Sequence, residues 1–257
     1  MKLVTNADDF GMNENVSMAI VESFKRGYIN QTTLMVNMPW AEQAVELAIR
    51  EGIFSRIGLH LNLTAGKPLT GRMANCSLFC NSEGVFDKRF ARLGNAYWGY
   101  SHRIESIIHD EVEAQVKKYC KWGFPLLHLD SHHHIHHRLP LAGLILPLVA
   151  KYDFKTIRLP YSIGFRGVHA CVRKGRNAFF RYLANRAGIG TTDEFGTPEA
   201  LARRPEAVTG ANSVELMVHP YYDAEGHLIN IVRYDDFEGP LMEETDRQIK
   251  ETICQIS

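Results

Sequence analysis

The chain has 257 residues, with 29 basic and 29 acidic side chains and a formal net charge of zero. No block of like charges points to nucleic acid or an anionic membrane as a partner, and no apolar run approaches the length of a membrane span. Because the N-terminus lacks the apolar core of a signal peptide and the five cysteines are scattered, we expect a cytoplasmic protein with reduced thiols.

Short apolar runs alternate with helical stretches along the whole chain. In chain order, the pattern predicts a strand at 3–7, helix 15–26, strand 32–36, helix 41–50, strand 57–63, helix 105–122, strand 126–130, helix 139–151, strand 155–159, helices 176–187 and 198–203, strand 214–218 and helix 241–256. Pro147 is expected to break or kink its helix. The segments 64–101 and 164–175 fit the alternation poorly, and we interpret both as loops covering a cleft.

This strand–helix alternation predicts an α/β fold with parallel strands. No linker or repeat divides the sequence, so we expect a single domain over 1–257. Polar residues follow the strands at Asp8, Asn37, Arg158 and His219. Since the carboxyl ends of parallel strands meet on one face, these side chains are expected to line one site. The pattern leaves an open sheet and a closed barrel as alternatives.

Two adjacent acids follow the first predicted strand, in the sequence Asn-Ala-Asp-Asp-Phe-Gly at 6–11. Carboxylates at such a position are unfavourable unless they are hydrated, paired or bound to a metal. One interpretation is a helix N-cap at Asp9 or Asn13. The other interpretation is that one of the two residues, Asp8 or Asp9, binds a metal through its carboxylate and the other acts as a base.

His60 and Asn62 alternate with leucines in the third strand, so they share the face opposite the leucines. A histidine at such a position can be an ordinary hydrogen-bonded core residue. Because an acid pair and a histidine cluster also lie at strand ends, we interpret His60 as a metal ligand.

Six of the 12 histidines lie in the stretch 128–137. His132 and His134 are expected to share one face after the chain turns, with His133 opposite. Not every imidazole can reach one ion, so several are expected to support the ligands, contact substrate or face solvent. An adventitious histidine site is the alternative, and the sequence leaves open the roles of His133, His136 and His137.

Four motifs together resemble the YdjC-like carbohydrate deacetylases. They are Asn-Ala-Asp-Asp-Phe-Gly at 6–11, Gly-Leu-His-Leu-Asn-Leu-Thr at 58–64, His-Leu-Asp-Ser-His-His-His-Ile-His at 128–136 and Glu-Leu-Met-Val-His-Pro at 215–220. Their order and approximate spacing match the family from residue 2 to about 245. The resemblance implies a deformed TIM-like (β/α) barrel and a divalent metal. It also implies removal of N-acetyl groups from acetylated, chito-oligosaccharide-like carbohydrates.

The resemblance also assigns roles to residues. It makes Asp9, His60 and His132 the metal ligands, Asp8 the base and His219 the acid. Further residues are predicted to support these groups or contact substrate: Asp130, His134, Arg158 and Asn62. Among them, Asp130 is expected to fix the tautomer of a ligand imidazole, and Arg158 matches loosely an arginine that orients the base.

The resemblance points to Mg²⁺, whereas two imidazoles and one carboxylate would also accept Zn²⁺. The expected partner is a small acetylated oligosaccharide, and a homodimer is a family-level expectation. Aromatic residues of the loop after His60 either stack on sugar rings or pack the loop: Phe79, Phe86, Tyr97, Trp98 and Tyr100.

Two other functions compete with deacetylation. A metal-dependent phosphoesterase would use a similar His/Asp cluster, but such sites often hold two or more metals and need further bridging carboxylates. A non-enzymatic metal- or sugar-binding protein would need the histidine cluster but neither Asp8 nor His219. Acetate release, compared between the parent protein and variants at these two residues, separates the alternatives.

Overall fold

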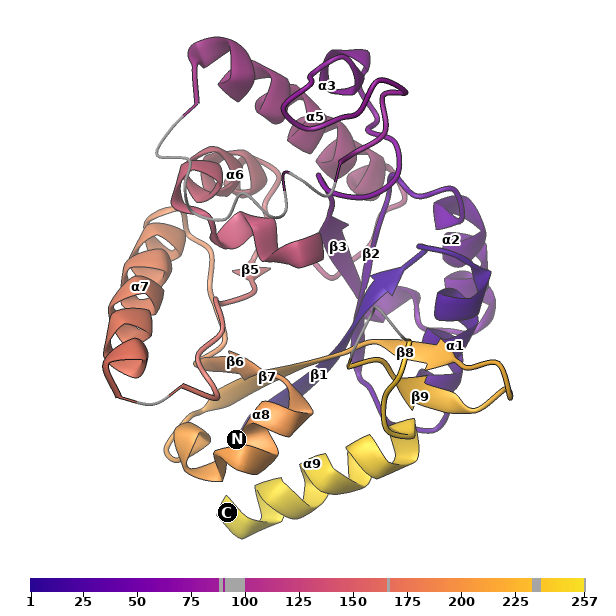
Figure 1. The fold of residues 1–257 in the computed structure, drawn as a ribbon, viewed down its shortest axis with the longest axis vertical. Coiled ribbons are helices and arrows are strands. Elements are labelled where there is room, and N and C mark those ends of the chain that lie inside the picture. The colour runs from indigo at the N-terminus through magenta and orange to yellow at the C-terminus, as the bar shows by residue number, and fades with distance from the viewer. Residues whose placement is uncertain (88–89, 91–99, 166, 233–236, 257) are drawn as a thin grey trace.

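Seven parallel strands form one curled sheet at the centre of the computed structural model, which describes residues 1–87, 90, 100–165, 167–232 and 237–256. The strand order is β5-β4-β3-β2-β1-β7-β6 (Figure 1). The strands are β1 (Lys2–Phe10), β2 (Gln31–Leu34), β3 (Ile57–Leu61), β4 (His128–Ser131), β5 (Thr156–Ile157), β6 (Glu194–Gly196) and β7 (Ser213–Val218).

Helices surround this sheet on the outside (Figure 1). They are α1 (Glu14–Lys25), α2 (Ala41–Arg50), α3 (Gly71–Ala74), α5 (His102–Lys121), α6 (Leu139–Lys151), α7 (Gly167–Arg186), α8 (Pro198–Arg203) and α9 (Met242–Ile256), with 3₁₀ turns η1 (Phe54–Arg56), η3 (His132–His137) and η4 (Pro205–Val208). A separate antiparallel hairpin, β8 (Pro220–Tyr222) and β9 (Leu228–Asn230), follows β7. Among the described residues, no helix is both long and apolar enough to cross a membrane.

The two edges of the sheet approach each other, so the sheet curls toward a barrel. Gly190, which precedes β6, donates its N–H to the Lys155 carbonyl at 2.8 Å and accepts from Ile157 N at 2.9 Å beside β5. The chain therefore forms a single α/β domain with a deformed TIM-like barrel, which confirms the predicted fold class.

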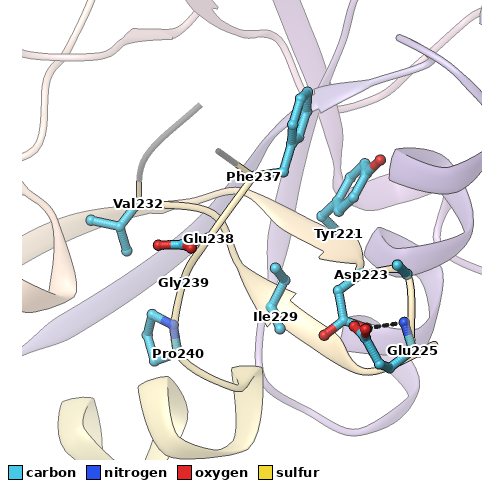
Figure 2. Close-up of a pocket in the computed structure, with 10 residues that line it drawn as sticks. Tyr221, Asp223, Glu225, Ile229, Val232, Phe237, Glu238, Gly239 and Pro240 are labelled. Carbon is cyan, nitrogen blue, oxygen red and sulfur yellow. Dashed lines mark hydrogen bonds between the residues drawn. The ribbon is translucent and has the colours of Figure 1, made fainter. Parts of the chain in front are cut away.

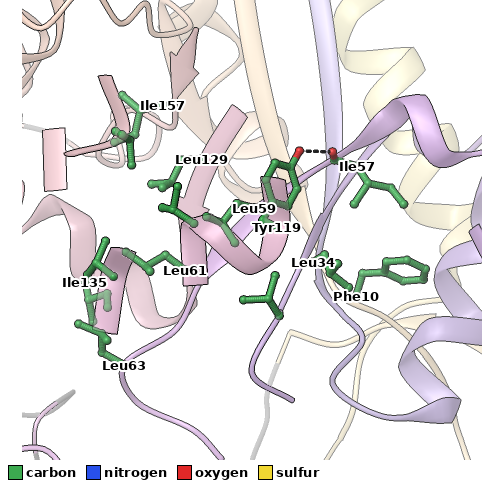
Figure 3. Packing of buried hydrophobic residues seen from close by; sticks show 14 of the residues in the cluster. Phe10, Leu34, Ile57, Leu59, Leu61, Leu63, Tyr119, Leu129, Ile135 and Ile157 are labelled. Atoms are coloured by element: carbon green, nitrogen blue, oxygen red, sulfur yellow. Dashed lines mark hydrogen bonds between the residues drawn. The ribbon is translucent and has the colours of Figure 1, made fainter. Parts of the chain in front are cut away.

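Leucine and isoleucine side chains from neighbouring strands form the core that fixes the sheet (Figure 3). Leu34, Leu59 and Leu129 are fully buried, and each contributes about 1.5–3 kcal/mol by removal from water. Tyr119 of α5 packs against them and donates its hydroxyl to the Ile57 carbonyl at 2.8 Å. The alternation in β3 that buries Leu59 and Leu61 in this core turns His60 to the opposite side, toward the site.

The loop predicted over 164–175 is wrong, and of the break or kink predicted at Pro147 the break does not occur. Helix α7 begins at Gly167, so most of the segment 164–175 is helical. Its first turns leave Val168 and Val172 77% and 67% exposed, so the apolar residues there do not mark a buried face. Helix α6 continues through Pro147 without a break. Gly143, whose carbonyl loses its helical partner, lies on the same exposed side, where water can satisfy that carbonyl.

Candidate active site

A bulge at the end of β1 places two carboxylates in one buried region. The pairing with β2 is regular at Ala7 and Thr32 but resumes only at Phe10 and Leu34, which leaves one extra residue in β1. Asp9 adopts a left-handed backbone with φ of 70°, a conformation that costs a non-glycine residue about 1–2 kcal/mol. Such bulges re-aim side chains beside active sites. Asp9 is not a helix cap, because Asn13 caps α1 through Val16 N.

Asp9, His60 and His132 converge although they come from β1, β3 and the turn after β4. The Asp9 Oδ1 atom lies 2.9 Å from His132 Nδ1 and 3.2 Å from His60 Nε2. One donor atom from each residue lies within 4.8 Å of the others, and all three side chains are buried. Two imidazole nitrogens and one carboxylate oxygen form a donor set typical of a catalytic divalent metal.

The environment of His60 fits a metal ligand. Its Nδ1 lies 2.7 Å from Asp130 Oδ1 and 3.1 Å from Thr33 Oγ1. Its Nε2 is buried without an aligned hydrogen-bond partner among the described residues, despite the 3.2 Å approach of Asp9. Burial alone would lower the pKa of His60, but Asp130 and Asp9 outweigh it and raise the pKa to about 10. The position facing Asp9 thus favours a cation, either a proton or a metal ion.

Arg158 links the carboxylates around this centre. Its guanidinium is fully buried and donates to both oxygens of Asp8, each at 2.7 Å. The same guanidinium lies 2.8 Å from Asp130 Oδ2 and 2.5 Å from Glu215 Oε1. Burial raises the pKa of Glu215. Three carboxyl groups therefore meet one guanidinium, with Asp9 beside them, and this gathering of carboxyl groups is a second observation that fits a divalent cation.

Asp8 is held as an anion by these contacts. Burial would raise its pKa, but the charge and hydrogen bonds of Arg158 outweigh burial and hold the pKa well below its usual range. Asn6 Nδ2 adds a further hydrogen bond of 2.8 Å to Asp8 Oδ1. The carboxylate is thus ionised at neutral pH and fixed in orientation beside Asp9.

His219 reaches the same region from β7. Ala7 of β1 pairs with Val218 of β7, so Asp8 and His219 each follow a residue of the same pair. The His219 backbone N–H donates to Asn230 Oδ1 at 2.8 Å. Burial lowers the pKa of its imidazole, while the charges of Asp8 and Asp9 act in the opposite direction. The structure brings Asp8, Asp9 and His219 together.

The other histidines of the cluster surround the centre rather than joining it. His133 and His134 adopt left-handed backbones, so His132 and His134 do not share the expected face. The His134 ring packs against Tyr161 and Phe195, and burial lowers its pKa to about 3. His133, His136 and His137 each make a local contact. His133 Nδ1 lies 2.9 Å from Thr64 Oγ1, while His136 and His137 approach the Arg158 carbonyl at 3.1 and 3.3 Å.

Asn62 lies apart from this centre. Its amide donates to the Ala65 carbonyl and to Asn37, and its Oδ1 accepts from Thr64 N and Ala65 N. These bonds order the turn after β3. Asn62 therefore supports the loop that carries Thr64, the partner of His133.

Sequence reasoning missed three residues of the polar network: Asn6, Thr33 and Glu215. Thr33 donates to Asp130 Oδ2 at 3.0 Å, and Glu215 accepts from Arg158. Glu215 lies in the largely apolar strand β7, where a charged residue was the available signal, whereas Asn6 and Thr33 have polar neighbours in β1 and β2. Their partners come from other strands, and single-strand patterns do not predict those pairings.

The predicted aromatic sugar contacts are only partly tested. Phe79 and Phe86 are buried in the core, so their rings pack the loop. Tyr97 and Trp98 lie outside the described residues. Tyr100 packs, partly buried, against the same core.

Comparisons with known proteins match nearly the whole chain. Residues 2–251 match the family described as YdjC-like protein. A carbohydrate deacetylase of Halalkalibacterium halodurans is 33% identical over 222 residues, which are 86% of this chain and 86% of that relative. A carbohydrate deacetylase of Vibrio cholerae is 40% identical over 152 residues, or 59% of this chain and 56% of the relative.

A solved structure shares the fold. The protein from Enterococcus faecalis V583, whose name proposes cleavage of cellobiose phosphate, superimposes with a TM-score of 0.70. The superposition covers 99% of this chain and 94% of that one, at 24% identity. At this identity the likeness supports the architecture alone.

Proposed function

The chain belongs to the YdjC-like protein family, and on this premise we propose that it is a metal-dependent carbohydrate deacetylase. It would remove N-acetyl groups from acetylated, chito-oligosaccharide-like carbohydrates. The relatives named carbohydrate deacetylase support this activity. The observation that carries the proposal is an anionic Asp8 held by Arg158 directly beside the Asp9–His60–His132 cluster.

We propose that Asp9, His60 and His132 hold a divalent metal. When bound, such an ion supplies Lewis acidity toward water and toward the acetyl carbonyl. Asp130 holds Nδ1 of His60, which would leave Nε2 free to bind the metal. Mg²⁺ is our proposal for the metal, by family, and the imidazole-rich donor set also suits Zn²⁺.

Asp8 is proposed as the general base. Its carboxylate is ionised and oriented by the two Arg158 bonds, so it can accept the proton of the attacking water. The low pKa limits its basicity, and positioning next to the ion-binding cluster is therefore its main contribution. Arg158 acts through Asp8 and is a positioning residue.

His219 is proposed as the general acid. Its protonated imidazole would donate to the nitrogen that leaves as the amide bond breaks. Because burial lowers its pKa, the protonated fraction depends on the nearby charges of Asp8 and Asp9. The protonation states of Asp8 and His219 therefore depend on each other, because the charge of each side chain shifts the pKa of the other.

A phosphoesterase with two metals fits this site less well. The two other buried donor groups within the described residues, Asp8–His60–Asp130 and His128–Asp130–Glu215, consist mainly of carboxylates that Arg158 already binds. A second ion would have to displace that guanidinium. The cytoplasmic location and the homodimer stay predictions.

The activity is tested by acetate release from N-acetylated chito-oligosaccharides. The parent protein should release acetate, lose this activity in a chelator and regain it when Mg²⁺ or Zn²⁺ is added back. A protein that releases no acetate under any of these metal conditions would contradict the proposed activity.

A further inference from the structure

A hollow of about 780 Å³ lies beside the β8–β9 hairpin, where the chain returns from β9 toward α9 (Figure 2). The residues that give it its chemical character come from both walls: Tyr221, Asp223, Glu225, Val232, Phe237 and Glu238. None of these residues belongs to the Asp8–Asp9 centre, so the hollow is a separate feature of the surface.

The hollow begins close to His219. Pro220 starts β8 directly after His219, and Ile231 N donates to the His219 carbonyl at 2.9 Å, which extends the hairpin ladder to this residue. Tyr221 follows His219 by two residues, about 7 Å along an extended strand. The lining of the hollow therefore begins within about 7 Å of His219 along the chain.

Two aromatic rings form one wall. The centroids of Tyr221 and Phe237 are 5.3 Å apart with an angle of 31° between the rings, and Figure 2 shows them side by side. Phe237 is 51% exposed and Val232 at the rim is 49% exposed. Exposed rings at a hollow offer the apolar face on which a sugar ring stacks.

Carboxylates form the rest of the polar lining. Asp223, Glu225 and Glu238 line the hollow, and no lysine or arginine does so among the described residues. Asp223 Oδ1 accepts from Glu225 N at 3.1 Å and His227 N at 2.8 Å, which fixes the hairpin turn. Where the described charged residues of a lining are all carboxylates, their field favours a cationic ligand over an anionic one.

Backbone hydrogen bonds hold the residues that follow Phe237 against residues 230–232. Val232 N donates to the Glu238 carbonyl at 3.0 Å, and Asn230 N donates to the Pro240 carbonyl at 2.8 Å. At Gly239 a Cβ atom would lie 1.7 Å from the Asn230 carbonyl oxygen, so only glycine allows this approach. Asn230 Oδ1 also accepts from His219 N. Asn230 thus positions both the segment that carries Phe237 and the backbone of His219.

We propose that this hollow is a subsite for an amino-sugar unit that carries a free, protonated amine. The ring would stack on Tyr221 and Phe237, and the ammonium group would face Glu225 and Glu238. The neighbouring N-acetylated unit of the same oligosaccharide would then lie at His219. This inference deepens the proposed deacetylase function and rests on it for the substrate class.

Calorimetric titration with a glucosamine tetramer tests the subsite, because this probe has no acetyl group and cannot be turned over. Phe237→Ala should weaken binding by about fivefold, the loss expected when an aromatic contact is removed. Glu238→Gln should weaken it by about threefold and reduce its salt dependence. Phe179→Ala, which removes a ring that is 48% exposed on α7, is the matched control and should bind as the parent does.

Absence of tetramer binding to the parent would overturn the subsite. So would equal affinity of the parent, Phe237→Ala and Glu238→Gln proteins, with their folds checked by circular dichroism. The deacetylase function is tested separately by acetate release from the acetylated tetramer. A protein that binds the glucosamine tetramer through Phe237 but releases no acetate would keep the subsite and contradict the proposed function.

Discussion

Arg158 donates two parallel hydrogen bonds of 2.7 Å to Asp8, one to each carboxylate oxygen. The two residues are 150 positions apart in the chain, and the guanidinium is fully buried. A buried arginine fork fixes both the charge and the orientation of its partner. Asp8 is thereby fixed as an ionised, oriented carboxylate beside the cluster of Asp9, His60 and His132.

Arg158→Lys should lower kcat by at least about tenfold, because lysine keeps the charge but cannot form the fork. With the hydrogen bonds of the fork lost, less would oppose the effect of burial, and the pKa of Asp8 would rise. The acid limb of the kcat/KM profile should then move to higher pH. A variant with reduced kcat but an unchanged acid limb would show that Arg158 acts on the fold rather than on Asp8.

His132→Ala should lose bound metal, whereas His137→Ala should keep it. His132 contacts Asp9 at 2.9 Å, while His137 approaches the Arg158 carbonyl and packs beside Phe180. Metal content after dialysis, measured by elemental mass spectrometry, distinguishes the two variants. Equal occupancy in both would remove His132 from the ligand set.

His219→Ala should reduce kcat by about a hundredfold and KM little, because a general acid acts mainly in the transition state. The activity should also lose the part of its alkaline limb that reflects deprotonation of His219. Substrates with a better leaving group should be affected less by the variant. An equal loss for all leaving groups would argue for a role of His219 in binding.

His128 should make the protein less stable in acid. Its ring is buried, and burial lowers the pKa to about 4, whereas an unfolded histidine titrates near 6.5. Between these values the unfolded chain binds the extra proton, so stability is complete above pH 6.5 and falls as the pH drops toward 4. From pH 6.5 to pH 5 the parent should lose about 1.5 kcal/mol through this residue.

The measurement for His128 is urea unfolding in chelator, which keeps metal release out of the comparison. His128→Leu should flatten the pH dependence by that amount, and the exposed control His102→Gln should not. An equal slope in parent and His128→Leu would contradict the buried neutral histidine.

The alternating pattern predicted most of the fold, because apolar periodicity is a local property. Helix α2 and helix α8 begin and end where the sequence predicts, and Thr197 caps α8. The short strand β6 and the β8–β9 hairpin were missed. Each of these strands has only three residues, too few for a periodic signal.

The candidate site was predictable as a set of residues but not as a network. Motifs singled out Asp8, Asp9, His60, His132 and His219, which the structure brings together. Arg158 was expected to orient the base, and its simultaneous contacts with Asp130 and Glu215 were not. Such contacts depend on how three strands pack, which no single strand encodes.

The Asp8→Asn variant tests the proposed deacetylase mechanism most directly, with metal content and acetate release measured on the same sample. Asparagine keeps the shape of the side chain but cannot accept the water proton. If Asp8 is the general base and not a metal ligand, the variant should have the metal content of the parent and release acetate about 10²–10⁴-fold more slowly. Metal-loaded Asp8→Asn protein that releases acetate at the parental rate would contradict it.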